Sequence, residues 1–233
     1  TAASNGANQI WERDLDKFMN RTNRRPLPTG QMSLREAYII CTFSLITGTI
    51  LLALINWKSA ILGVLAFISY VFIYTPLKQK TPWAVFVGAF PGAIPPLLGA
   101  IAHTNAFGFE PGVLFFVQFT WQFPHFWAIA WVSHTDYSKV GFKLLPADKG
   151  PTKFTALQAV MYAVLMVPIG FLPNYFKITG EWSMWVVLVA NIFMVVQCVR
   201  LYQNMGVPAA RRVMFSSYIY LPIVYLALMA NKI

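Results

Sequence analysis

Three side chains near the start of the chain carry oxygen ligands at every fourth position: Asn8, Glu12 and Asp16. On a helix each step of four residues advances only ~40°, so all three share one face, which spans ~12 Å. Carboxylate and amide oxygens suit Mg²⁺, which takes one or two protein carboxylates and completes its shell with water and substrate phosphates. The spacing therefore predicts catalytic metal ligands for Mg²⁺ ions bridged by a diphosphate. The alternative is a solvated helix end with ordinary charge pairs.

Three arginines directly follow this face, in the segment RTNRRPLP, where the prolines cannot continue a helix. Guanidinium groups make bidentate contacts with phosphate oxygens. We expect Arg21 and Arg24 to act in catalysis by stabilising charge on a leaving phosphate group, and Arg25 to bind the substrate. Lys78, in the segment YTPLKQKTPW, is a further candidate phosphate contact.

A histidine interrupts the aromatic segment FTWQFPHFWAIAW. An ionisable residue inside a membrane helix is a functional hypothesis by default. We therefore predict that His125 is catalytic and that Gln122 contacts a flat aromatic substrate. A neutral histidine that hydrogen-bonds a neighbouring helix is the alternative.

The next connection, SHTDYSKVGFKLLP, supplies another polar group of residues. Asp136, Tyr137 and Lys139 are candidate substrate contacts there, either as a second acidic patch or as a phosphate contact.

The elements that must position these residues are long apolar segments. The chain has 233 residues and is 57% hydrophobic but only 11% charged, against ~25% charged in a soluble domain. About seven stretches approach the ~20 residues that a helix needs to cross the bilayer, and they lack the alternation of barrel strands. They are residues 37–57, 59–74, 83–102, 112–133, 154–172, 184–201 and 213–230. The sequence predicts an all-α membrane helix bundle.

Two of these stretches have features that bear on their shape. The stretch 59–74 is short, and we expect it to extend through Pro76. The segment PGAIPPLLGA allows either close helix packing or a broken helix that lines a cavity. Cys41 and Cys198 lie in apolar stretches and are expected to be small buried hydrophobic residues rather than disulfide or zinc ligands.

The net charge of +10 follows from topology rather than from a nucleic-acid partner. Alternate connections hold all of the basic residues except Lys58, Lys177 and Lys232. This positive-inside pattern predicts that the basic face, with Asp148 and Lys149 among its charges, is cytoplasmic, or faces the matrix in a mitochondrion. Most of the acids lie on the same face, although the rule does not require it, which indicates a site there.

These segments together resemble the UbiA superfamily of intramembrane prenyltransferases, and within it the protohaem IX farnesyltransferase branch. The resemblance rests on NQIWERDLDKFMNRTNRRPLPTG, YTPLKQKTPW, GAIPPLLGA and WQFPHFWAIAW followed by DYSKVG, and it runs through the whole chain. It implies one UbiA-type domain over residues 1–233. The family has about nine membrane helices, so we expect the N-terminal part to be missing here.

The resemblance also implies a reaction and a site. Farnesyl diphosphate, haem B and water would give haem O and diphosphate, with Mg²⁺ and the prenyl diphosphate at Asn8, Glu12 and Asp16. His125 would ligate the haem iron, orient the porphyrin or handle a proton. The second acidic motif of the superfamily matches Ser133 and Tyr137, neither of which is acidic. This departure leaves a full second metal site unsupported.

Expected partners are farnesyl diphosphate, haem B, the lipid bilayer and a haem A synthase-type enzyme that receives haem O. The bacterial inner membrane is the expected location, with the mitochondrial inner membrane as the alternative. Two other functions stay open: prenylation of a quinone precursor or another aromatic acceptor, and a haem carrier without catalysis. The missing second acidic motif speaks against the first, and the acids beside three arginines speak against the second.

Overall fold

The structure, a computed structural model, describes residues 1–147 and 150–233. Asp148 and Lys149, which the charge pattern assigns to the basic face, lie outside the described residues. The described chain folds into helices, and its β-structure is one isolated bridge between Thr179 and Lys232. It forms two compact units. Unit 1 comprises Thr1–Asn105 and Ser133–Leu144, and unit 2 comprises Ala106–Val132 and Leu145–Ile233.

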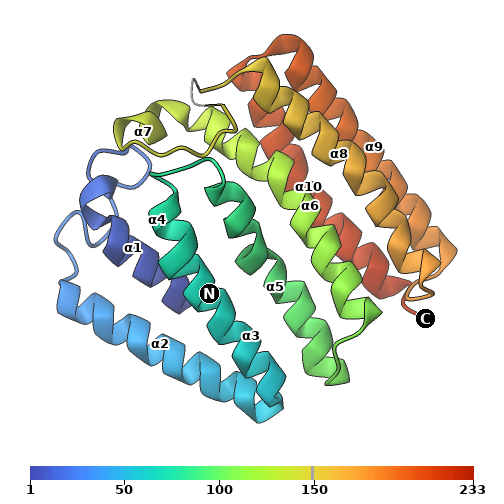
Figure 1. Cartoon of the computed structure of the whole chain (residues 1–233), viewed down its shortest axis with the longest axis horizontal. Helices are drawn as coiled ribbons and strands as arrows, with labels where there is room; N and C mark the ends of the chain where they lie inside the picture. Colours follow the sequence, from blue (N-terminus) through green and yellow to red (C-terminus); the bar gives the residue numbers. More distant parts are fainter. Residues whose placement is uncertain (148–149) are drawn as a thin grey trace. The chain divides into compact units, whose positions relative to one another are not determined.

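Unit 1 is built from helices that pack on their neighbours in the chain (Figure 1). Helix α1 packs on α2, α2 on α3, and α3 on α5. The Ser33 hydroxyl and the Glu36 carboxylate form a capping box that fixes the start of α2. The elements of unit 1 are α1 (Ala2–Asp16), α2 (Leu34–Ile55), α3 (Trp57–Ile68), the π-helical segment η1 (Ser69–Tyr74), α4 (Thr75–Leu77), α5 (Ala84–Thr104) and α7 (His134–Lys139).

The second membrane helix of unit 1 contains the wide turns of η1 just before a proline. Pro76 has no N–H to donate, and its ring would clash with the carbonyl of Phe72 in a regular α-helix. The π-helical turns of Ser69–Tyr74 relieve this conflict, and the helix then continues through Leu77. The expectation that stretch 59–74 extends through Pro76 is therefore confirmed. Wide turns of this kind often lie at functional sites.

Helix α5 is continuous from Ala84 to Thr104 although Pro91, Pro95 and Pro96 lie within it. The alternative of a broken helix is therefore wrong, and close packing holds. Gly88 shows why small residues are needed, because a Cβ there would come within 2.6 Å of the Tyr74 ring. The close contact between α5 and η1 therefore depends on the absence of a side chain at Gly88.

Unit 2 is a ring of four helices, in which α6 packs on α8, α8 on α9, α9 on α10 and α10 on α6 (Figure 1). A buried polar cluster joins three of these helices. The Asn191 amide donates to the Met166 carbonyl (3.0 Å), and the Tyr220 hydroxyl donates to Asn191 Oδ1 (2.7 Å). The elements are α6 (Phe109–Val132), α8 (Lys153–Tyr175), α9 (Glu181–Asn204) and α10 (Val207–Ala230).

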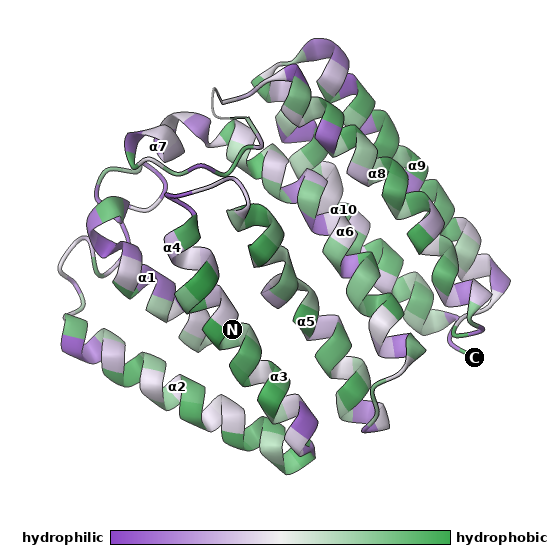
Figure 2. Cartoon of the chain, viewed as in Figure 1, coloured by the Kyte–Doolittle hydropathy of each residue, from purple (hydrophilic) through white to green (hydrophobic). Residues whose placement is uncertain are grey.

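The long helices are apolar along their length, and hydrophilic residues concentrate at their ends (Figure 2). Within the described residues, 6 helices are long and apolar enough to cross a membrane. The seventh predicted span, 112–133, is the 24-residue helix α6, which falls outside this set. Two glutamines and His125 interrupt its apolar sequence. The chain is an integral membrane protein, and the free cysteines Cys41 and Cys198 are buried as predicted.

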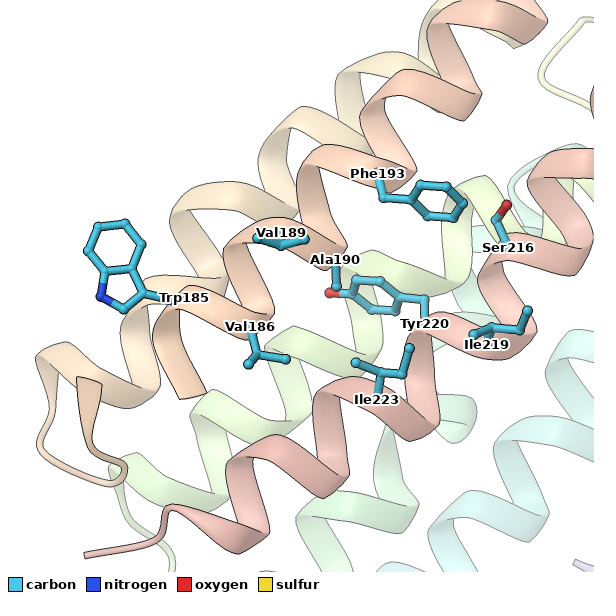
Figure 3. Close-up of a pocket in the computed structure, with 9 residues that line it drawn as sticks. All are labelled: Trp185, Val186, Val189, Ala190, Phe193, Ser216, Ile219, Tyr220 and Ile223. Carbon is cyan, nitrogen blue, oxygen red and sulfur yellow. The ribbon is translucent and has the colours of Figure 1, made fainter. Parts of the chain in front are cut away.

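The outer surfaces of the membrane helices remain apolar. Only 6% of the most apolar window of α2 is buried within the protein. Side chains of α9 and α10 border an open groove of ≈ 470 Å³ (Figure 3). Its lining residues are Trp185, Val186, Val189, Ala190, Phe193, Ser216, Ile219, Tyr220 and Ile223. Such surfaces are suited to contact with lipid chains.

Candidate active site

The acidic face of α1 is buried within unit 1. Asn8, Glu12 and Asp16 are only 7%, 4% and 0% exposed, so the alternative of a solvated helix end is wrong. Burial of two carboxylates is costly unless cationic groups or hydrogen-bond donors compensate them. The partners of these oxygens therefore indicate what the site is built to hold.

Lys78 compensates the charge of Glu12, beside Asn8, in the N-terminal part of this face. Its Nζ lies 2.8 Å from Glu12 Oε1 and 2.9 Å from Asn8 Oδ1, and the Asn8 amide donates to Glu12 Oε2 (2.8 Å). The ammonium also lies 4.8 Å from the centre of the Tyr74 ring. The sequence predicts a phosphate contact at Lys78, and in this structure its ammonium forms a buried ion pair with Glu12. This pair places the helix after η1 against α1.

Thr75 adds a hydroxyl to the same group. Its Oγ1 lies 3.1 Å from Asn8 Oδ1 and 2.9 Å from the Tyr70 carbonyl. The sequence analysis missed Thr75. Its position three residues before Lys78, and thus on the same helix face, was the available signal.

The charge of Asp16, at the C-terminal end of the acidic face, is compensated only in part. Arg25 Nη1 pairs with Asp16 Oδ2 at 2.7 Å, whereas Asp16 Oδ1 is buried and has no hydrogen-bond partner among the described residues. The Thr22 hydroxyl, another residue that the sequence analysis missed, holds the turn by donating to the Asp16 carbonyl (3.2 Å). Asp16 therefore presents a buried anionic oxygen that is free to accept a ligand.

The three arginines have different positions. Arg25 is tied to Asp16, and Arg21 Nη2 donates to the Tyr137 hydroxyl (3.0 Å). Arg24 is exposed and has no partner within the part of the chain that the structure describes. The structure thus brings Arg21 and Arg25 to the walls of the site and leaves the guanidinium of Arg24 available to an anion.

Helix α7 fixes the arginine loop. Asp136 pairs with Lys139 (2.8 Å), and this ammonium, together with the backbone amides of Asn20 and Arg21, holds the pKa of the Asp136 carboxyl below its usual value. Asp136 and Lys139 therefore bind each other and the loop. Tyr137 binds Arg21, so all three residues predicted in this connection lie beside the site rather than forming a second acidic patch.

The remaining predicted residues belong to unit 2. His125 is buried, with Nδ1 2.7 Å from the Ser217 hydroxyl oxygen, and its ring stacks on Trp121 at 4.5 Å between centres. Gln122 is buried and donates to the Gln118 carbonyl (3.3 Å). These contacts are consistent with the alternative of a neutral histidine that hydrogen-bonds a neighbouring helix. The other ring nitrogen, Nε2, has no hydrogen-bond partner among the described residues.

The donor set fits a metal that is bound together with a phosphate. No group of three or more histidine, cysteine or acidic side chains that could hold a metal ion by itself occurs among residues 1–147 and 150–233. Mg²⁺ does not need one, since one or two carboxylates suffice when phosphate oxygens and water complete its shell. Asp16 Oδ1 is the oxygen that is open to such an ion.

Comparison with known proteins identifies the family. The model of the UbiA prenyltransferase family matches residues 1–219. The chain belongs to the UbiA prenyltransferase family. Its membrane helices are thus those of a UbiA-type prenyltransferase, as the sequence resemblance implied.

Curated relatives of this UbiA chain are similar along its whole length. A protein from Cytophaga hutchinsonii named protoheme IX farnesyltransferase is 47% identical over 234 residues, which cover 100% of this chain and 82% of the relative. A protein of the same name from Flavobacterium psychrophilum is 44% identical, with 99% of this chain and 78% of the relative covered.

Solved structures confirm the UbiA fold. A digeranylgeranylglyceryl phosphate synthase matches with a TM-score of 0.80 and 23% identity, over 98% of this chain and 80% of that one. A UbiA homologue from Archaeoglobus fulgidus, bound to GPP and Mg²⁺, matches with a TM-score of 0.68 and 17% identity, over 97% and 83% of the two chains. At these identities the likeness concerns the fold.

Proposed function

We propose that this chain transfers the farnesyl group of farnesyl diphosphate to a vinyl group of haem B and so forms haem O. The buried acidic face of α1 carries the proposal, since it ends in an open carboxylate oxygen beside arginines. The curated relatives named for this activity, at up to 47% identity, identify the acceptor. The whole chain, residues 1–233, is proposed to be one UbiA-type domain.

The chain's own residues would bind and activate the diphosphate. Asp16 and Glu12, with Asn8 beside them, would hold Mg²⁺, which supplies positive charge against the leaving diphosphate when it is bound. Arg24 is free to bind phosphate oxygens, and Arg21 is held ready for the same contact by Tyr137. Lys78 neutralises Glu12 in the absence of substrate and would gain a second anionic partner when the diphosphate enters.

The reaction balances without a redox partner. The C–O bond between the farnesyl group and the diphosphate breaks, and the vinyl carbon forms a new C–C bond to the farnesyl carbon. Water then adds to the adjacent vinyl carbon as a hydroxyl group and releases one proton. Fixed cationic groups that stabilise the departing charge are a large source of rate acceleration.

The charge pattern supports a proposed orientation. Arg21, Arg24, Arg25 and Lys78 lie in the connections that the positive-inside rule assigns to the cytoplasm. We expect the active site to face the cytoplasm from the bacterial inner membrane, or the matrix in a mitochondrion. Haem O would then pass to a haem A synthase-type enzyme.

The test is product formation in membranes that contain the protein. Haem B and farnesyl diphosphate are supplied with and without Mg²⁺, and the extracted haem is analysed by mass spectrometry. The proposal expects hydroxyethylfarnesyl haem only when both substrates and Mg²⁺ are present. Prenylation of a quinone precursor in place of haem, or haem binding without any product, would overturn it.

A further inference from the structure

The side chain of His125 is held by a short chain of hydrogen bonds in unit 2. Its Nδ1 lies 2.7 Å from Ser217 Oγ, and Ser217 Oγ lies 2.6 Å from the Met214 carbonyl oxygen. Ser217 is fully buried on α10, and His125 lies on α6. The two helices pack directly on each other, so this chain of bonds is part of their interface.

The direction of these bonds follows from the number of protons. A serine hydroxyl has one hydrogen and two acceptor lone pairs, and a carbonyl oxygen can only accept. The 2.6 Å contact with the Met214 carbonyl therefore requires the Ser217 hydrogen, because two bare oxygens at that distance would repel each other. The Ser217 oxygen is then an acceptor toward His125, and Nδ1 must carry the hydrogen.

Aromatic contacts fix the plane of the same ring. The Trp121 ring stacks on His125 with an angle of 17° between the planes, and its indole N–H donates to the Ser217 carbonyl (3.2 Å). Tyr218 meets the imidazole edge-on at 5.2 Å. On α10, Ser217 thus forms the hydrogen bond with the imidazole, and Tyr218 helps to fix the orientation of its ring.

The second ring nitrogen is left open. Nε2 makes no hydrogen bond with any residue that the structure describes, and the side chain is not completely enclosed, with 8% exposure. A neutral imidazole with its hydrogen on Nδ1 has a lone pair on Nε2. This atom can accept a proton or bind an electrophilic metal centre.

We propose that Ser217 is a positioning residue for the acceptor side of the reaction: its hydroxyl holds His125 in the Nδ1–H tautomer and leaves the Nε2 lone pair to the acceptor substrate. This inference rests on the proposed function, because it takes the acceptor to be a porphyrin that meets His125. Partners of this kind around a ligand histidine typically change affinity or activity by 10- to 100-fold when they are removed.

The first measurement is the tautomer itself. The chain has only 3 histidines, so ¹⁵N spectra of histidine-labelled protein in detergent can be assigned with His125→Gln. The wild-type protein is expected to show a hydrogen on Nδ1 and a bare Nε2 at His125. In Ser217→Ala the hydrogen is expected to redistribute toward Nε2. A wild-type spectrum with the hydrogen on Nε2 would overturn the proposal whether or not the variants fold.

The second measurement is kinetic, with a matched control on the same helix. Ser217→Ala is expected to lower kcat/KM for haem B by about tenfold, with the KM for farnesyl diphosphate unchanged. Ser216→Ala removes a neighbouring hydroxyl that does not touch His125 and should match the wild type. Ser217→Thr keeps the hydroxyl and should retain most of the activity. Equal haem kinetics in the two alanine variants would contradict the role of Ser217.

Two acceptor probes separate the uses of the Nε2 lone pair. If Nε2 binds iron, the Soret band of bound haem B shifts in Ser217→Ala, and the affinity for metal-free protoporphyrin IX is the same in both proteins. If Nε2 accepts a proton, Ser217→Ala lowers turnover while the Soret band stays in place. Either result supports the assignment of the tautomer. If wild-type membranes form no haem O, the proposed function fails, and the ¹⁵N spectrum still tests the hydrogen bond.

Discussion

Each unit buries a polar cluster between its helices, and the two clusters differ in how their groups are satisfied. In unit 2 the Asn191 amide and the Tyr220 hydroxyl have partners at 3.0 and 2.7 Å. In unit 1 the acidic face of α1 is compensated by Lys78 and Arg25, but Asp16 Oδ1 has no partner among the described residues. The unit 2 cluster is thus closed, because both of these groups have partners. The unit 1 cluster is open, because Asp16 Oδ1 has none among the described residues.

The difference separates structure from function. A satisfied polar group between membrane helices fixes their packing at little cost. A buried carboxylate oxygen without a donor is costly, and at Asp16 we propose that a ligand offsets this cost. Substitutions in the unit 2 cluster should therefore change stability, and substitutions in the acidic face of unit 1 should change turnover.

The largest expected effect comes from Glu12→Gln. This change removes one of the two carboxylates and leaves the Lys78 ammonium buried without its anion. We expect haem O formation to fall by about 100-fold or more and the unfolding temperature in detergent to fall as well. The double variant Glu12→Gln/Lys78→Met removes both charges and should regain stability but not activity. Wild-type turnover in either variant would refute the role of Glu12.

Packing behind the site gives the next largest effect. Gly88→Ala would place a methyl group within 2.6 Å of the Tyr74 ring, the ring above which Lys78 lies. Overpacking of this kind costs about 1–3 kcal/mol. The matched change Gly99→Ala, on the same helix, meets nothing within 4 Å and should not destabilise the protein. Thermal unfolding of the two variants in detergent makes the comparison, and equal losses would contradict the packing argument.

A smaller effect is expected in the closed cluster of unit 2. Tyr220→Phe removes the hydroxyl that donates to Asn191 Oδ1, and hydrogen bonds between membrane helices contribute about 0.6 to 1.7 kcal/mol. We expect a lower unfolding temperature with unchanged turnover per folded molecule. Tyr202→Phe, a change at an exposed tyrosine of the neighbouring helix α9, serves as the control. If Tyr220→Phe lost turnover without losing stability, the unit 2 cluster would not be purely structural, and the contrast between the two clusters would be contradicted.

The smallest effect concerns pH. Because the folded state lowers the pKa of Asp136, its contacts stabilise α7 fully above the ordinary value of 3.8. This contribution is lost as the pH falls through the lower pKa of the folded state. The protection of the Asn20 and Arg21 amides against hydrogen exchange, measured relative to the intrinsic exchange rate at each pH, should therefore fall below pH 3.8. In Asp136→Asn the exchange should be fast at neutral pH already, and an unchanged rate there would exclude the contact.

The sequence could predict the acidic face, because four-residue spacing places side chains on one face whatever surrounds the helix. It also predicted the membrane helices from their length and apolarity. It could not predict that Arg25 pairs with Asp16, since this pairing depends on how the chain turns after α1. The contact of Lys78 with Asn8 joins residues 70 positions apart, and it depends on the wide turns of η1.

The central claim is that the open oxygen of Asp16 takes part in holding a magnesium–diphosphate group. Its most direct test is the binding of labelled farnesyl diphosphate to the protein in membranes while Mg²⁺ is titrated, for the wild type and for Asp16→Asn. The account predicts that wild-type binding requires Mg²⁺ and that Asp16→Asn needs at least about tenfold more of it. Equal binding by both proteins at every Mg²⁺ concentration would contradict the account.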